Sequence, residues 1–93
     1  MELFNRGLSR RVVIKNDLGI HARPAAMIAK LAGDAKSDVW IAKGKKWANA
    51  SSVIDLLALV CPKGEGLSIT IDDPSDIDVL NKLIMLVENG FGE

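Results

Sequence analysis

The 93-residue sequence lacks most of the features that mark secreted, membrane-bound or nucleic-acid-binding proteins. Its single cysteine, Cys61, excludes an internal disulfide framework and suits a reducing compartment, where we expect it to pack as a small apolar residue. Twelve basic and twelve acidic residues balance, so net charge does not favour nucleic acid or anionic membrane as a partner. No segment approaches the roughly 20 apolar residues of a membrane span, and residues 1–8 lack the apolar stretch of a secretory signal. We therefore expect a cytoplasmic protein that binds neither nucleic acid nor membrane.

The length is that of one domain with a modest core. The periodicity of apolar residues along the chain predicts secondary-structure elements in the order β-α-β-β-α-β-α. Strand patterns cover residues 11–15, 38–43, 46–49 and 67–71, and helical patterns cover residues 22–31, 53–59 and 77–87. This order indicates an α+β domain whose antiparallel sheet carries helices on one face. The pattern alone leaves the order of the four strands open.

The second and third strands form a predicted hairpin around Gly44. The turn centres either on residues 43–44 or on residues 44–45, and a shift of one residue would change which face carries Trp40 and Trp47. The turn region also carries three lysines, which we expect to be solvated: Lys43, Lys45 and Lys46.

The only histidine, His21, lies in the segment GIHARPAA (residues 19–26), directly before an alanine-rich helical pattern. The first turn of a helix offers unpaired backbone N–H groups and partial positive charge. Arg23 adds a permanent positive charge. Pro24 lies in the first helical turn, where the lack of a backbone N–H costs little free energy because these groups have no partner within the helix. A lone histidine is often a structural side chain, but this combination favours a site for a transferable phosphoryl group.

This segment and the element order together resemble the HPr family, the histidine phosphocarrier proteins of the bacterial phosphoenolpyruvate-dependent phosphotransferase system. The similarity runs from about residue 10 to about residue 88, so we expect one domain over residues 1–93 with an N-terminal extension at residues 1–7. The resemblance implies an open-faced β-sandwich, in which three helices cover one face of a four-stranded antiparallel sheet.

The resemblance also implies the roles of two residues. Nδ1 of His21 would accept a phosphoryl group from enzyme I and pass it to the EIIA domain of a sugar permease, while Arg23 would stabilise the phosphate. Imidazole suits this role because it is nucleophilic near neutral pH, and a covalent phosphohistidine divides one transfer into reversible steps. We therefore expect a monomeric carrier rather than an enzyme, acting in sugar uptake or its regulatory branch, without a cofactor or a metal.

The second predicted helix concerns partner binding. Residues 53–59 are apolar almost all round, whereas a surface helix usually hides one apolar stripe. In the family this helix docks enzyme I and EIIA, and the matching residues are Val53, Ile54 and Leu57. Simple burial of these side chains is the alternative.

Ser52 lies 31 residues after His21, which is the spacing of the family's regulatory serine. One interpretation is a phosphorylation site for a serine kinase and phosphatase, through which the chain would bind a transcription regulator. The other interpretation is a helix cap with no further role. Ser51 and Asp55 depart from the residues usual beside this serine and weaken the first interpretation. Leu18, which replaces a small polar residue, would alter access to the histidine.

Two other function classes remain open. A pure binding module would act through phosphorylated Ser52 alone. An independent phosphatase or mutase would use His21 as its nucleophile, but it needs a second acid or base. Because there is no second histidine, only a carboxylate brought close by the fold would serve.

Overall fold

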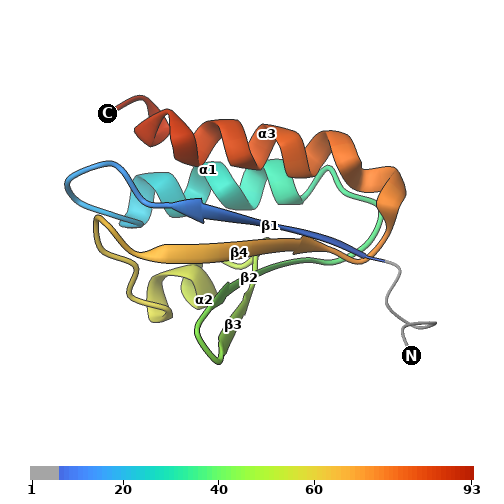
Figure 1. Cartoon of the computed structure of the whole chain (residues 1–93), viewed down its shortest axis with the longest axis horizontal. Coiled ribbons are helices and arrows are strands. Elements are labelled where there is room, and N and C mark those ends of the chain that lie inside the picture. Colours follow the sequence, from blue (N-terminus) through green and yellow to red (C-terminus); the bar gives the residue numbers. More distant parts are fainter. Residues whose placement is uncertain (1–6) are drawn as a thin grey trace.

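The computed structural model describes residues 7–93, so the expected N-terminal extension lies outside the described residues except for Gly7. In the described part, three helices cover one face of a four-stranded sheet, which confirms the predicted α+β fold (Figure 1). The strands are β1 (Leu8–Val13), β2 (Val39–Lys43), β3 (Lys46–Asn49) and β4 (Gly66–Ile71). The helices are α1 (Ala22–Ala32), α2 (Val53–Ala58) and α3 (Ile77–Glu88), with short 3-10 turns η2 (Pro74–Asp76) and η3 (Gly90–Gly92).

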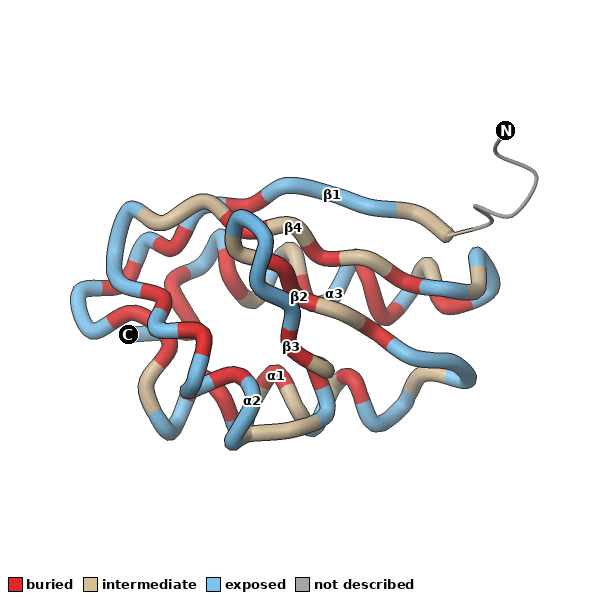
Figure 2. Tube along the Cα trace, turned by 90° about the horizontal axis from the view of Figure 1, so that it is seen from below, coloured by how far each residue is buried: buried red, intermediate tan, exposed pale blue. Residues whose placement is uncertain are grey.

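The sheet has the order β1-β4-β2-β3, and every neighbouring pair is antiparallel. Burial alternates along β4, so one face of this strand points to the helices and the other face stays open (Figure 2). β1 begins and ends earlier than the sequence pattern predicts, because it pairs with the full length of β4 from Leu8 to Val13. Ser9 and Arg10 are polar and exposed, and they separate Leu8 from the apolar pattern that marks the rest of the strand.

The β2–β3 hairpin closes through the two-residue turn 44–45, because Lys43 pairs with Lys46. This register places Trp40 and Trp47 on the same, open face of the sheet. Lys43 is not solvated as predicted. Its Nζ donates hydrogen bonds to the carbonyl oxygens of Leu59 at 3.0 Å and Val60 at 2.6 Å, so it ties the hairpin to the end of α2.

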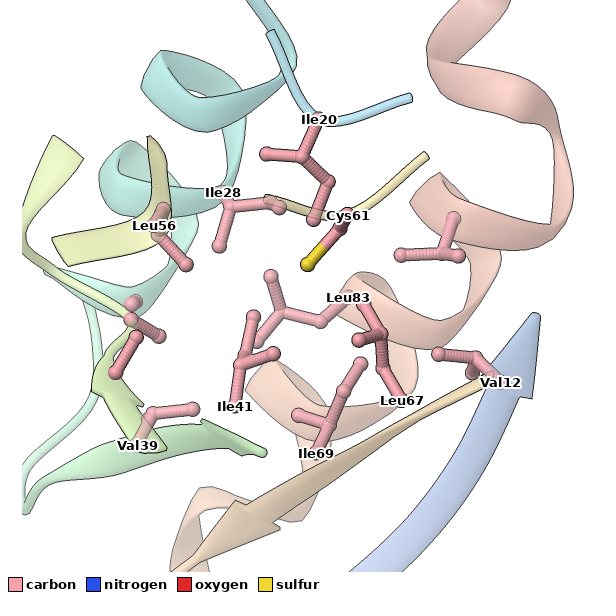
Figure 3. Packing of buried hydrophobic residues seen from close by; sticks show 14 of the residues in the cluster. Val12, Ile20, Ile28, Val39, Ile41, Leu56, Cys61, Leu67, Ile69 and Leu83 are labelled. Carbon is pink, nitrogen blue, oxygen red and sulfur yellow. The ribbon is translucent and has the colours of Figure 1, made fainter. Parts of the chain in front are cut away.

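The core lies between the sheet and the helices (Figure 3). Ile41 and Ile69 enter it from the sheet, Ile28 from α1 and Leu83 from α3. The sulfur of Cys61 points into the same cluster, and burial raises the pKa of this thiol. Cys61 therefore packs as an apolar residue, as predicted. No helix among the described residues has the length and apolar character needed to span a membrane.

Candidate functional site

His21 occupies the N-cap position of α1, with an extended backbone and no capping bond from its side chain. Helix geometry leaves the N–H groups of Ala22 and Arg23 without an intrahelical acceptor, and Pro24 in the first turn has no N–H. The structure thus places an imidazole and a guanidinium at the positive end of α1, as the sequence predicts.

The loop before the histidine is held against the chain that follows α2. Ile20 donates its N–H to the carbonyl oxygen of Cys61 at 2.9 Å. Gly19 has a positive φ of 65°, and a Cβ on this residue would overlap the same carbonyl oxygen. A glycine is therefore required here both for backbone conformation and for close approach, and this contact fixes where His21 enters the helix.

Glu93 completes the site, although the sequence gives no sign of its role. One carboxylate oxygen, Oε2, lies 2.8 Å from Nε2 of His21 and 3.0 Å from a terminal nitrogen of Arg23. The other oxygen, Oε1, accepts a hydrogen bond of 2.9 Å from Nδ2 of Asn16. These hydrogen bonds, above all those from Asn16 and His21, hold the pKa of Glu93 below its ordinary value.

Asn16 is a second residue that sequence reasoning missed. Its side chain is buried, and Nδ2 also donates to the carbonyl oxygen of Gly19 at 2.8 Å. The asparagine therefore connects the loop before His21 with the carboxylate of Glu93.

The segment after α3 brings Glu93 to this place. Gly90 and Phe91 both adopt positive φ values after α3, and the C-terminal end lies at the same end of the molecule as the start of α1 (Figure 1). The ring of Phe91 is buried in the core, and its carbonyl oxygen accepts a hydrogen bond of 3.2 Å from Arg23. An apolar anchor thus places a carboxylate beside a histidine 72 residues earlier in the sequence.

This arrangement has the chemistry of an anion site. A neutral amide, an imidazole and a guanidinium converge on one carboxylate. Phosphoryl oxygens are acceptors for the same donors, and charged donors give the stronger hydrogen bonds. Within the described residues, no three His, Cys, Asp or Glu side chains form a group that could hold a metal ion.

Helix α2 presents an apolar surface close to this loop. Ile54 is 79% exposed and Leu57 is also exposed, whereas Val53 is half-buried against the core and Leu56 is the buried residue of the helix. Within residues 7–93, Ile54 is therefore almost uncovered and Leu57 is partly exposed, so the described part of the chain buries neither residue, against the alternative of simple burial.

Two further residues enlarge this surface. Leu18 and Val60 are exposed, and together with Leu57 they line a shallow hollow beside Ile20. Leu18 and Val60 thus extend the apolar surface of α2 that Ile54 and Leu57 form. Val60 has a positive φ of 55°, a strained conformation for a β-branched residue, and the hydrogen bond from Lys43 holds its carbonyl group.

Ser52 is the N-cap of α2, and its Oγ accepts a hydrogen bond of 3.2 Å from the N–H of Asp55. Ser52 therefore caps the helix, as one of the two interpretations predicted. The regulatory interpretation stays a prediction.

Comparison with known proteins agrees with this fold. The chain matches the family model for the PTS HPr component phosphorylation site over residues 8–89. It is 31% identical over 86 residues to the phosphocarrier protein HPr of Cupriavidus necator, covering 92% of this chain and 97% of that protein. It is 37% identical over 87 residues to the phosphocarrier protein NPr of Shewanella violacea, covering 92% and 94%. A crystal structure of HPr-C-His from Thermoanaerobacter tengcongensis aligns with a TM-score of 0.84 at 31% identity, covering 92% of this chain and 97% of that one. The chain therefore belongs to the HPr family, the phosphocarrier proteins of the phosphotransferase system.

Proposed function

We propose that this chain, acting as a single-domain carrier, receives a phosphoryl group from enzyme I on Nδ1 of His21 and passes it to an EIIA domain. One observation supports this role most strongly: at the start of α1, His21 and Arg23 both contact one anionic group, the carboxylate of Glu93. The free N–H groups of the first turn add further donors for phosphoryl oxygens. Phosphoryl transfer depends mainly on positioning and charge stabilisation, and these groups supply both.

A carrier fits the site better than an independent phosphatase. A phosphatase would need a second acid or base, and Glu93 is the carboxylate that the fold brings close to His21. The donors around Glu93 hold its pKa below the ordinary value, so it stays charged at neutral pH and has no proton to give a leaving group. Its oxygens already accept hydrogen bonds from Asn16, His21 and Arg23, so it is poorly placed to activate a water as a base. The chain thus shares its chemistry with partner proteins and completes no reaction alone.

We assign docking of both partners to the apolar surface of α2, with Val53, Ile54 and Leu57 in contact. Exposed apolar side chains beside a reactive residue suit transient protein contacts. A monomer moving between partners in the cytoplasm agrees with this role. The downstream output is sugar uptake or the regulatory branch of the system.

We also propose that Ser52 is a regulatory phosphorylation site. A phosphate there would sit at the N-terminus of α2, two residues before Ile54, and would place negative charge at the docking surface. A serine kinase, a phosphatase and a transcription regulator would then be further partners. Incubation of the wild type and Ser52→Ala with ATP and the cognate kinase tests this site, and equal labelling of the two proteins would exclude it.

The carrier function is tested by incubating the protein with phosphoenolpyruvate and enzyme I and measuring its intact mass. We expect one added phosphoryl group that is labile in acid and stable in alkali. His21→Ala should abolish this modification, whereas Ser52→Ala should retain it. A modification that persists in His21→Ala would refute the assignment.

A further inference from the structure

Building on the carrier function proposed above, we propose that Asn16 and Glu93 are positioning residues for the transfer. Asn16 holds the carboxylate of Glu93, and Glu93 holds a proton on Nε2 of His21, which leaves Nδ1 free as the nucleophile. The two residues lie outside the segment GIHARPAA: Asn16 belongs to the loop that follows β1, and Glu93 follows α3.

The direction of the hydrogen bond defines the form of the imidazole. An ionised carboxylate only accepts hydrogen bonds, so the ring nitrogen 2.8 Å from Glu93 must carry the hydrogen. In a neutral imidazole the lone pair then lies on the other nitrogen, Nδ1. Nδ1 has no hydrogen-bond partner among residues 7–93 and is therefore available for attack.

Asn16 fixes the carboxylate. The residue is only 5% exposed, and its Nδ2 serves two acceptors at once, the carbonyl oxygen of Gly19 and Oε1 of Glu93. Its Oδ1 is buried and has no hydrogen-bond partner among residues 7–93. A buried unpaired oxygen costs about 1–3 kcal/mol, so an asparagine is a costly choice for packing alone. Its amide nitrogen explains that choice, because it binds Glu93 to the loop that carries His21.

The chemistry of the transfer explains why a carboxylate is useful at this position. The lone pair of Nδ1 attacks the phosphorus of a phosphoryl donor protein. The N–P bond forms while the bond from phosphorus to the donor's leaving atom breaks, and that atom takes the electron pair. His21 keeps its hydrogen on Nε2, so the ring gains positive charge, which the carboxylate of Glu93 offsets. Transfer to the acceptor is the reverse, with the N–P electron pair returning to Nδ1.

The same contacts have a second interpretation with the opposite consequence. Glu93 also binds Arg23, so its carboxylate could compete with the phosphoryl group for the guanidinium. A competitor slows phosphoryl acceptance and its removal speeds it, whereas removal of a positioning residue slows acceptance. We favour positioning because the tightest contact of Glu93 joins it to the ring nitrogen that does not react.

Single-turnover phosphorylation by saturating phosphorylated enzyme I distinguishes these interpretations. We expect Glu93→Ala and Glu93→Gln to accept the phosphoryl group roughly ten- to a hundredfold more slowly, with an unchanged half-saturating donor concentration. Asn16→Ala should slow acceptance by a smaller factor. Glu88→Gln is the matched control, because Glu88 is an exposed carboxylate at the end of α3, and its rate should equal that of the wild type.

A second measurement tests the geometry without phosphorylation. In ¹⁵N-histidine-labelled protein, the Nε2–H proton of His21 should give an exchange-protected signal in the wild type and Glu88→Gln, and this signal should be lost in Glu93→Ala. Its absence in the wild type, or its persistence in Glu93→Ala, would overturn the proposal. Equal or faster acceptance by Glu93→Ala would overturn it too and would identify Glu93 as a competitor. Failure of the wild type to be phosphorylated at His21 would instead refute the carrier function and leave this NMR test intact.

Discussion

Replacement of Ile54 by alanine should weaken partner docking and leave the fold nearly unchanged. The side chain is 79% exposed, so most of its apolar surface is free to be covered by a partner. Ile→Ala removes three carbon groups, and at about 0.8 kcal/mol for each one the loss on full burial in a complex is about 2 kcal/mol. Incomplete coverage halves this value, so we expect a loss of about 1–2 kcal/mol, or roughly 5- to 30-fold in Kd.

The cost to folding should be much smaller than the cost to docking. Only about a fifth of the Ile54 side chain is covered within the chain, so the free energy of unfolding should fall by about 0.5 kcal/mol. Met85→Ala is a matched control, since Met85 is also an exposed apolar residue, 61% exposed, but lies on α3.

Titration calorimetry with enzyme I and with an EIIA domain measures docking, and urea denaturation measures stability. Ile54→Ala should lose affinity for both partners, while Met85→Ala should keep the affinity of the wild type. Wild-type affinity in Ile54→Ala, or an equal loss in Met85→Ala, would refute docking on the apolar surface of α2.

Four further predictions follow from the structure. Val60→Gly relieves the strain of a positive φ and should raise the free energy of unfolding by about 1 kcal/mol, measured by urea denaturation; a decrease would show that the conformation is not strained. Ser52→Ala removes the cap on Asp55 and should lower the free energy of unfolding by about 1 kcal/mol, and no change would contradict the capping role. Burial raises the pKa of the Cys61 thiol, so alkylation should proceed only as fast as the protein unfolds, and rapid labelling of the native protein would contradict its burial. Hydrogen bonds lower the pKa of Glu93, so its stabilising contacts should be complete above the ordinary glutamate value of 4.5 and lost as pH falls through the lowered value; a ¹³C titration at or above 4.5 would contradict these contacts.

The local spacing of apolar residues was sufficient to predict most of the helices and strands. The alternation along residues 67–71 predicted β4, and the helical spacing from residue 77 predicted α3. The strand order β1-β4-β2-β3 joins segments far apart in the chain, so the resemblance to a known family was needed to predict it. The start of β1 was missed because Ser9 and Arg10 are polar and exposed and separate Leu8 from the apolar pattern.

The candidate site was predictable only in part. His21 and Arg23 lie two residues apart at a helix start, and such local spacing is visible in a sequence. Glu93 reaches the histidine across 72 residues because Phe91 is buried in the core, and no local signal marks such a contact. Lys43 was assigned to solvent because a lysine in a hairpin usually points outward, but here it meets the carbonyl groups at the end of α2.

The most direct test of the carrier function is the discharge of the isolated phosphorylated protein. The chain is phosphorylated, freed of enzyme I and phosphoenolpyruvate, and mixed with an EIIA domain, and the intact masses of both proteins are followed over time. We expect each phosphoryl group lost from His21 to appear on the EIIA domain, and we expect Glu88→Gln to behave in the same way. Release as inorganic phosphate, or retention on the chain in the presence of every EIIA domain of its host, would contradict the account.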